Sequence, residues 1–392
     1  MDIIQVDDVE DLLLETKKRK VYIYGAKTIA WRAEHYLRSN EIAIEGYVVS
    51  KTYEKRDDSR QDNVYYIEDM KEHFFDCIVL AVSREHIWSV VEKLGVYNIQ
   101  KLVIISPFLD DAFPEAYIVS DQSTLSAHAF IHKKVQIICD ENSKIYIEDD
   151  VMIEEGTIIV VSNNSTLVIK QGVKIGKNSH ITVESDSKIE IGQKTVLKCG
   201  VKMKCSVCSD VTIADNVVIG EDGNVFAEKN SIIDVGCQSG LSSEIHIVAT
   251  ENGKCMIKNK VYISSQGKLM TAKEGYIKIG RGTTINSNAY IGVFQSFVEI
   301  CEDCMLSFYV KMNTGNHTII EKCTQREVTN RLPIILHQHV WVGMGATLLA
   351  GCEVGEGSIV GANTIVNKKI PENSICVGPD ARIVRQDIEW QR

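Results

Sequence analysis

Several features of other protein classes are missing from this sequence of 392 residues. Its formal net charge is -10, from 43 basic and 53 acidic residues, so it lacks the positive footprint of a nucleic-acid-binding protein. No apolar stretch approaches the roughly 20 residues needed to cross a bilayer. The first eight residues, MDIIQVDD, lack the basic and apolar regions of a secretory signal. We therefore expect a cytoplasmic protein with no nucleic-acid partner and no membrane insertion.

Twelve cysteines are present, but in a reducing compartment free thiols behave as small apolar side chains. We therefore expect none to be paired. Cys205 and Cys208, like Cys301 and Cys304, have CxxC spacing, which by itself is a weak zinc signal. In the repeat described next, Cys205 occupies a packing position and Cys208 a polar corner, so the two should face differently. Packing is the favoured interpretation, and structural zinc is the alternative.

Aliphatic residues return every 22 positions along much of the chain. Four residues of each repeat are polar and turn-forming, as in Asn163-Asn164-Ser165. The pattern predicts coils with three six-residue faces and one corner that carries a row of small turns. The three columns are Leu125, Ile147, Ile169, Ile191, Ile213, Val235, Ile257, Ile279 and Ile300; Ile131, Ile153, Ile175, Leu197, Ile219, Leu241, Ile263, Ile285 and Leu306; and Ile137, Ile159, Ile181, Met203, Val225, Ile247, Leu269, Ile291 and Met312.

After this array, aliphatic residues follow one another every six positions, without the four extra residues of the earlier repeats. Large aliphatic residues stand at Val342, Leu348, Val354, Val360 and Val366. Four positions after each of them stands a mostly small residue, at Ala346, Cys352, Ser358, Thr364 and Ile370. No amphipathic helix has this period. A parallel β-helix fits, because its coils bury their faces only by stacking. Six-residue faces in threes resemble the left-handed parallel β-helix of the hexapeptide-repeat acyltransferases.

The first 113 residues have a different character. Residues 1–19 are predicted as a helix, with acidic residues early and basic residues late. Strands and helices then alternate, which predicts a parallel sheet of Rossmann type. Pro107 and Pro114 bracket a linker, so we expect a Rossmann-like α/β domain at 1–113 and the β-helix at 114–392. The predicted strands are 20–26, 45–49, 76–82 and 101–105, and the predicted helices between them are 28–39 and 85–94.

Gly25 ends the first of these strands and invites a dinucleotide interpretation. The fingerprint needs glycines where Lys27 and Ala30 stand, and an acid near Ser50, so NAD binding is disfavoured. The segment loosely resembles the small Rossmann-like domain that precedes the β-helix in some sugar acetyltransferases. That resemblance implies nucleotide-sugar handling, and a purely docking or packing domain is the open alternative.

The hexads lapse once, in a polar loop at about 313–335 that contains His317. Such loops are tolerated mainly where they build a site. Together with the loop histidine, four later motifs are similar to the sugar and polysaccharide O-acetyltransferases of the hexapeptide family. The resemblance implies acetyl-CoA as acyl donor, a sugar hydroxyl as acceptor and no metal. The motifs are Val340-Trp341-Val342-Gly343, Gly361-Ala362-Asn363, Lys369-Ile370-Pro371 and Gly378-Pro379-Asp380-Ala381-Arg382.

By that resemblance His317 is the general base, and imidazole suits removal of a hydroxyl proton near neutral pH. Cys323 could instead accept the acyl group, but direct transfer needs no covalent intermediate. The thioester oxygen gains charge in the transition state and needs a fixed donor. The family analogy assigns that donor to the backbone of Gly343 or Met344. Acceptor contacts are expected from Asn313, Asn316 and Arg326.

The resemblance also implies where the donor binds. Trp341 would line the acyl-CoA groove, although subunit packing would explain it as well. Basic side chains would meet the phosphates of coenzyme A. Pro379-Asp380 replaces the Asn-Pro of the family and puts a carboxylate near the expected adenosine. The expected donor-binding set is Trp341, Gly361, Ala362, Lys368, Lys369, Pro371 and Arg382.

Three other functions remain open from the sequence. An N-acetyltransferase acting on a nucleotide-linked amino sugar would use the same base and groove. A zinc enzyme resembling the γ-class carbonic anhydrases would need histidine ligands, but the hexad frame turns His337 and His339 outward. An assembly scaffold would not explain the histidine loop. We predict an O-acetyltransferase of surface polysaccharide biosynthesis, with the acceptor sugar unspecified. The family resemblance implies that it associates as a homotrimer.

Overall fold

The computed structural model describes residues 1–6, 9–25, 30, 33–34, 37–38, 41–51, 64–82, 86–105, 117–118, 123–126, 128–132, 134–315, 318–328 and 331–392. The chain divides into two compact units. One comprises Met1–Glu115 with Ser126–His128, and the other comprises Ala116–Leu125 with Ala129–Arg392. The predicted boundary between residues 113 and 114 lies outside the described residues.

The first unit contains a parallel six-stranded sheet in the order β1-β6-β5-β2-β3-β4. Buried apolar residues form two separate clusters, as expected when both faces of a sheet are covered. The sheet is parallel, as the alternating strands and helices predicted, and the assignment of this unit to the Rossmann type stays a prediction. The elements are β1 (Asp2–Gln5), α1 (Val9–Thr16), β2 (Val21–Tyr24), β3 (Ile44–Val49), β4 (Val64–Tyr66), the 3-10 helix η1 (Ile67–Asp69), β5 (Phe75–Leu80), α3 (Ile87–Leu94) and β6 (Ile99–Ile104).

The prediction of one helix over residues 1–19 is wrong at its start. Residues Asp2–Gln5 form β1 and pair in parallel with β6 at the sheet edge, and within the described part of this stretch only Val9–Thr16 is α-helical. The order of charges favoured a helix, but residues 2–5 form a strand because they pair with β6 instead. Gly25 has φ +129°, and a Cβ there would lie 2.4 Å from the carbonyl oxygen of Ala81. The crowded backbone therefore explains this glycine without a dinucleotide.

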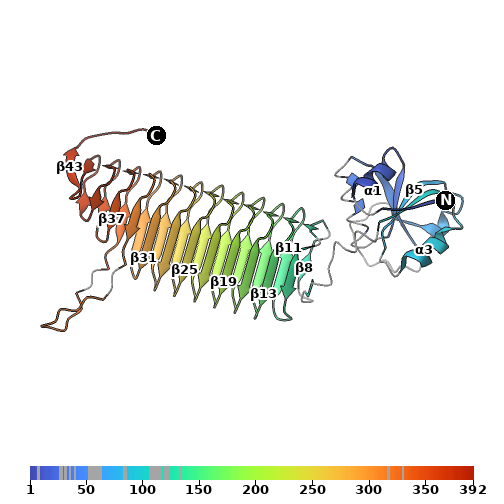
Figure 1. The fold of residues 1–392 in the computed structure, drawn as a ribbon, viewed down its shortest axis with the longest axis horizontal. Coiled ribbons are helices and arrows are strands. Elements are labelled where there is room, and N and C mark those ends of the chain that lie inside the picture. Colours follow the sequence, from blue (N-terminus) through green and yellow to red (C-terminus); the bar gives the residue numbers. More distant parts are fainter. Residues whose placement is uncertain are drawn as a thin grey trace. The chain divides into compact units, whose positions relative to one another are not determined.

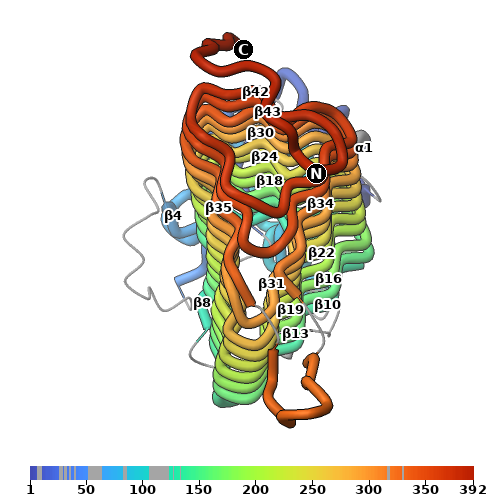
Figure 2. The backbone as a smooth tube through the Cα atoms, turned by 90° about the vertical axis from the view of Figure 1, so that its left-hand side faces the viewer, coloured from blue at the N-terminus to red at the C-terminus, as the bar shows by residue number. Residues whose placement is uncertain are grey.

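The second unit is a three-sided parallel β-helix, which confirms the predicted fold class (Figure 1). Each coil contributes one strand to each of three faces, which we call faces 1, 2 and 3 in chain order. The corners between faces 1 and 2, 2 and 3, and 3 and 1 are the first, second and third corners. Figure 2 shows the coils stacked behind one another along the prism.

The three faces are parallel sheets of 12, 12 and 13 strands in the described residues, with β43 the one antiparallel member. Face 1 contains β7 (Tyr117–Ile118), β10 (Gln136–Cys139), β13 (Ile158–Ser162), β16 (His180–Glu184), β19 (Lys202–Ser206), β22 (Asn224–Glu228), β25 (His246–Thr250), β28 (Lys268–Ala272), β31 (Tyr290–Phe294), β34 (Lys311–Asn313), β37 (Thr347–Leu349) and β40 (Ile365–Val366). Face 2 contains β8 (Thr124–Leu125), β11 (Lys144–Ile147), β14 (Thr166–Ile169), β17 (Lys188–Ile191), β20 (Asp210–Ile213), β23 (Ile232–Val235), β26 (Lys254–Ile257), β29 (Tyr276–Ile279), β32 (Phe297–Ile300), β35 (Ile334–Leu336), β38 (Glu353–Val354) and β41 (Lys369–Ile370). Face 3 contains β9 (Phe130–Ile131), β12 (Met152–Ile153), β15 (Lys174–Ile175), β18 (Val196–Leu197), β21 (Val218–Ile219), β24 (Gly240–Leu241), β27 (Tyr262–Ile263), β30 (Thr284–Ile285), β33 (Met305–Leu306), β36 (Trp341–Val342), β39 (Ile359–Val360), β42 (Ile375–Val377) and β43 (Arg382–Arg385).

The aliphatic columns predicted from the sequence form one continuous core. Ile137, Ile159 and Ile181 stand in register on neighbouring coils and are fully buried. The other column residues join the same cluster, with Leu125 packed partly exposed at its first coil. The small-residue column of the last coils is buried as well. Every coil is covered by its neighbours, so the core runs the length of the stack.

The predicted row of small turns lies at the first corner. Asn163 and Asn164 have φ of +56° and +62°, and similar pairs recur in the following coils. Inside this corner, the Ser165 N–H donates to the Ser143 hydroxyl at 3.2 Å, and the Ser187 N–H to the Ser165 hydroxyl at 3.2 Å. The serine ladder satisfies backbone groups that would otherwise be buried without partners.

The cysteines follow the predicted repeat frame. Cys205 is buried and Cys208 is exposed, so the two face differently as expected. Burial raises the pKa of the Cys205 thiol to about 12, which keeps it protonated and unreactive. All twelve cysteines are free thiols. Among the described residues, no helix is both long enough and apolar enough to span a bilayer.

Candidate active site

The coils shorten near the carboxyl end of the stack. In the regular stack, Ile153 of face 3 pairs with Ile175, 22 residues on, whereas Val342 pairs with Val360, 18 residues on. The four residues that disappear are those of the first corner. At the change of length, a loop of residues 314–333 leaves that corner between β34 and β35 and projects from the prism (Figures 1 and 2). The loop therefore occupies the position of a small turn in the regular coils.

The proposed base and one acceptor residue, His317 and Asn316, lie outside the described residues. Asn313 ends β34, and its side-chain oxygen accepts the Gly315 N–H at 2.9 Å, which turns the chain into the loop. Arg326 is exposed on the returning half, where its carbonyl accepts the Glu321 N–H at 2.9 Å. The structure thus puts Asn313 at the base of the loop and Arg326 farther along it.

The predicted backbone donors lie at the third corner. A Cβ on Gly343 would be 2.7 Å from the Ala362 nitrogen, so the two coils approach closely there. The Gly343 N–H already donates to the Val360 carbonyl at 2.7 Å, and the Gly361 N–H to the Cys376 carbonyl at 2.8 Å. The Met344 N–H has no acceptor within the described part of the chain. Of the two predicted donors, Met344 is therefore the one left available.

The predicted donor-binding residues are spread over two faces. Trp341 lies on the outer side of β36 in face 3, and its indole N–H donates to the Ser307 hydroxyl at 3.2 Å. Arg382 is also in face 3, exposed on β43. Lys369 lies in face 2, and Lys368 is exposed at the first corner just before it. Within one chain, the structure does not gather these side chains into one pocket.

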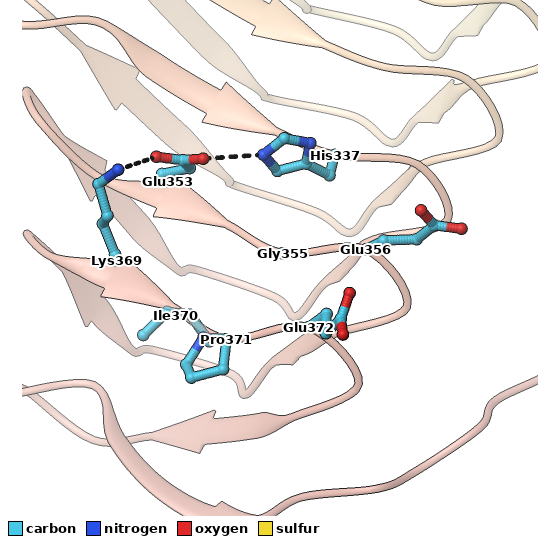
Figure 3. Close-up of a pocket in the computed structure, with 8 residues that line it drawn as sticks. All are labelled: His337, Glu353, Gly355, Glu356, Lys369, Ile370, Pro371 and Glu372. Carbon is cyan, nitrogen blue, oxygen red and sulfur yellow. Dashed lines mark hydrogen bonds and ion pairs between the residues drawn. The ribbon is translucent and has the colours of Figure 1, made fainter.

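A pocket of about 410 Å³ lies instead on face 2 of the last coils (Figure 3). Glu353 is its centre, with one carboxylate oxygen 3.0 Å from His337 Nε2 and the other 2.6 Å from Lys369 Nζ. The Lys369 ammonium, and then His337, hold the pKa of Glu353 below its usual value. Sequence reasoning missed Glu353, whose only signal in the sequence was its outward position next to the inward Val354; its pairing with Lys369 on the neighbouring strand comes from the structure. The other lining residues are Gly355, Glu356, Ile370, Pro371 and Glu372.

His337 and His339 face outward, as the hexad frame predicted, beside the buried residues Leu336 and Val340. They bond different carboxylates, since His339 Nδ1 lies 2.6 Å from Asp303 Oδ2. Within the described ranges, no three His, Cys, Asp or Glu side chains are grouped as metal ligands would be. The two histidines therefore do not converge on a common point.

The fold and these coils define a class of protein. Residues 333–368 match the family model described as bacterial transferase hexapeptide (six repeats). These last coils are thus similar to the hexapeptide-repeat transferases, which confirms the resemblance found in the sequence.

Several curated relatives match a part of this chain. A provisionally named acetyltransferase of Schizosaccharomyces pombe is 35% identical over 91 residues, 23% of this chain and 44% of that protein. A provisionally named lipopolysaccharide biosynthesis O-acetyltransferase of Escherichia coli, WbbJ, is 29% identical over 111 residues, covering 26% and 56%. Galactoside O-acetyltransferase of Escherichia coli is 28% identical over 89 residues, covering 23% and 44%. The chain spans about half the length of these relatives.

Proposed function

We propose that this protein is an acetyl-CoA-dependent O-acetyltransferase that acetylates a sugar hydroxyl. The observation that carries the proposal is the loop of residues 314–333, which interrupts the stack directly before the coils that match the hexapeptide transferases. Irregular loops on a rigid scaffold commonly hold catalytic residues. Relatives whose names specify O-acetyltransferases of lipopolysaccharide and galactosides support a saccharide acceptor.

The proposed reaction is a direct transfer. The His317 imidazole takes the proton of the acceptor hydroxyl while the oxygen attacks the thioester carbonyl carbon. The Met344 N–H donates to the carbonyl oxygen as it becomes negative. The carbon–sulfur bond then breaks, and His317 returns the proton to the leaving sulfur, so that coenzyme A departs as the free thiol. Asn313, Asn316 and Arg326 would orient the acceptor.

Trp341, Gly361 and Ala362 would hold the acyl end of the donor, and the exposed Lys368 and Arg382 would meet its phosphates. Lys369 and Pro371 line the pocket on face 2, so they contact the donor only if the donor extends from face 3 around the second corner onto face 2. Surface polysaccharide biosynthesis in the cytoplasm is the setting we propose.

We also propose that the active protein is a homotrimer. Loop 314–333 and Met344 leave the prism at opposite edges of face 1, so a second copy could bring a loop to the third corner. Several apolar side chains are exposed together on the loop, among them Ile320 at 52% and Val328 at 50%, and a group of exposed apolar residues is typical of an interaction surface. Tyr262 on face 3 is 48% accessible and could be covered by the same association.

An acceptor screen tests the proposal. The protein would be incubated with acetyl-CoA and a panel of neutral sugars, amino sugars, nucleotide sugars and oligosaccharides, and free thiol release would be followed. NMR of the product would locate the acetyl group. We expect an acetyl ester on a sugar oxygen. An acetamide as the sole product would replace the proposal with N-acetylation, and no thiol release with any acceptor would count against both.

A further inference from the structure

The residues after β43 form a strap, which we define as residues 386–392. It runs back over the second corner toward earlier coils, as the segment ending at the C label in Figure 1 shows. The Ile388 N–H donates to the Asn373 carbonyl at 3.0 Å. Arg392 donates to the carbonyls of Gly282 and Cys304 at 3.0 and 2.9 Å. The strap is therefore fixed to coils far apart in sequence.

His339 links the strap to Asp303 through two hydrogen bonds of its imidazole ring, which together we call the clasp. Its Nδ1 lies 2.6 Å from Asp303 Oδ2, and its Nε2 lies 3.0 Å from the Trp390 carbonyl oxygen. Both partners are acceptors, so both ring nitrogens must carry a proton for both bonds to form. The charged groups facing the ring are Asp303 on the preceding coil and Arg392 on the strap, whose Nε is 3.1 Å from Asp303. The complete clasp thus requires the imidazolium form of His339.

Trp390 is the buried side chain of the strap, only 8% exposed. Its ring stacks on His339 at 4.0 Å between centroids, and its indole N–H donates to the His339 carbonyl at 3.0 Å. The Trp341 ring is a second aromatic neighbour of Trp390, with its centroid 5.9 Å away and an interplanar angle of 46°. Trp341 is therefore held between the Ser307 hydroxyl and the strap.

We propose that the strap is a positioning element of the acyl-donor site, in which His339 and Trp390 fix the orientation of Trp341 on face 3. This inference rests on the proposed function, because it takes Trp341 as a wall of the donor groove. His339 and Trp390 are positioning residues, since they act through Trp341. Releasing the strap should weaken donor binding and leave the acyl-transfer step little changed.

The clasp should also make donor binding depend on pH. The Trp390 carbonyl, and then Asp303, raise the pKa of His339 above its usual value. A raised pKa in the folded state means that the stabilisation is complete at pH below about 6.5, the unperturbed value, and is lost as pH rises through the raised pKa. The Michaelis constant for acetyl-CoA should therefore increase toward alkaline pH.

Trp390→Ala tests the positioning role, with Trp88→Ala as the matched control because Trp88 is 68% exposed on α3 in the other unit. We expect Trp390→Ala to raise the Michaelis constant for acetyl-CoA by about 2-fold to 10-fold, the range that one aromatic contact supports. The turnover number should change less than about twofold. Hydrogen exchange of residues 386–392 would verify that the strap has been released.

Two substitutions at His339 test the clasp. His339→Gln removes the charge and should raise the acetyl-CoA constant at acid and neutral pH, to about the value that the parent protein reaches at alkaline pH. His339→Arg keeps a charge that can donate to both acceptors and should flatten the pH dependence. A released strap with an unchanged acetyl-CoA constant, or a His339→Arg profile identical to that of the parent, would overturn the proposal.

Calorimetric binding of coenzyme A separates this proposal from the proposed function. If the parent protein neither binds coenzyme A nor transfers acetyl groups, the proposed function fails and the positioning role fails with it. If the parent binds and turns over normally but Trp390→Ala binds coenzyme A as tightly as the parent does, only the role of the strap is refuted.

Discussion

The regular 22-residue coils and the 18-residue coils at the carboxyl end share one core but differ at their corners. In both, inward aliphatic residues such as Ile213 and Val360 are fully buried. In the regular coils, the first corner closes with small turns and a serine ladder. In the short coils the first corner is four residues shorter, and at the change of length one loop replaces a turn. The third corner of the short coils leaves the Met344 N–H without an acceptor among the described residues. The buried aliphatic columns therefore stabilise the fold in both kinds of coil. The corners that differ between them are where we expect the catalytic groups.

The largest expected effect tests the loop side of this comparison. His317→Ala should lower turnover by roughly 10² to 10⁴-fold, because it removes the proton acceptor of the proposed mechanism. His180→Ala, at an exposed position on β16 in the regular stack, is the control and should be neutral. Steady-state kinetics with an acceptor from the screen measures both. A His317 variant with near-normal turnover would remove this residue from the mechanism.

A core substitution should lower stability and leave turnover unchanged, the opposite of what we expect for His317→Ala. Ile213→Ala should lower the free energy of unfolding by about 2 to 5 kcal/mol, because it leaves a cavity in the continuous core. The activity of the folded fraction should be unchanged, since Ile213 lies in the regular stack. Urea titration followed by circular dichroism gives the stability, and kinetics gives the activity. Normal stability with impaired turnover would contradict the division between columns and corners.

Charge reversal at the short coils should have a moderate effect. Lys368→Glu should raise the Michaelis constant for acetyl-CoA by about 10-fold to 100-fold, the loss expected for one charge-assisted phosphate contact of about 1.5 to 3 kcal/mol. Added salt should weaken donor binding by the parent protein as well. Lys268→Glu, exposed on β28 of the regular stack, is the matched control. If the acceptor constant moved instead, the basic residues would belong to the sugar site.

Chelation should have the smallest effect. The proposed mechanism uses a histidine and a backbone N–H, so dialysis against EDTA should leave turnover unchanged within error. The same sample should sediment as a trimer. Activity that is lost to chelator and restored by zinc would revive the interpretation of the loop and outer-surface histidines as metal ligands.

Much of this architecture could be predicted from the amino-acid sequence. Each residue of a column, such as Ile159, must face the interior if residues six positions apart repeat around three faces, so burial followed from spacing alone. The first-corner turns followed from Asn163 and Asn164, which tolerate positive φ. Local charge was a weaker guide, since it predicted a helix where Asp2–Gln5 pairs with β6.

Only the tertiary structure decided which side chains meet. Trp390 lies 51 residues from His339 in sequence, and no periodicity connects them, yet the two rings stack. Lys369 follows Lys368 directly, but its side chain pairs with Glu353 on face 2. Spacing determines the face on which a residue lies because the backbone repeat is regular. Contacts between coils and at the ends of the stack depend on how separate segments pack and which rotamers result, so they follow from the folded molecule alone.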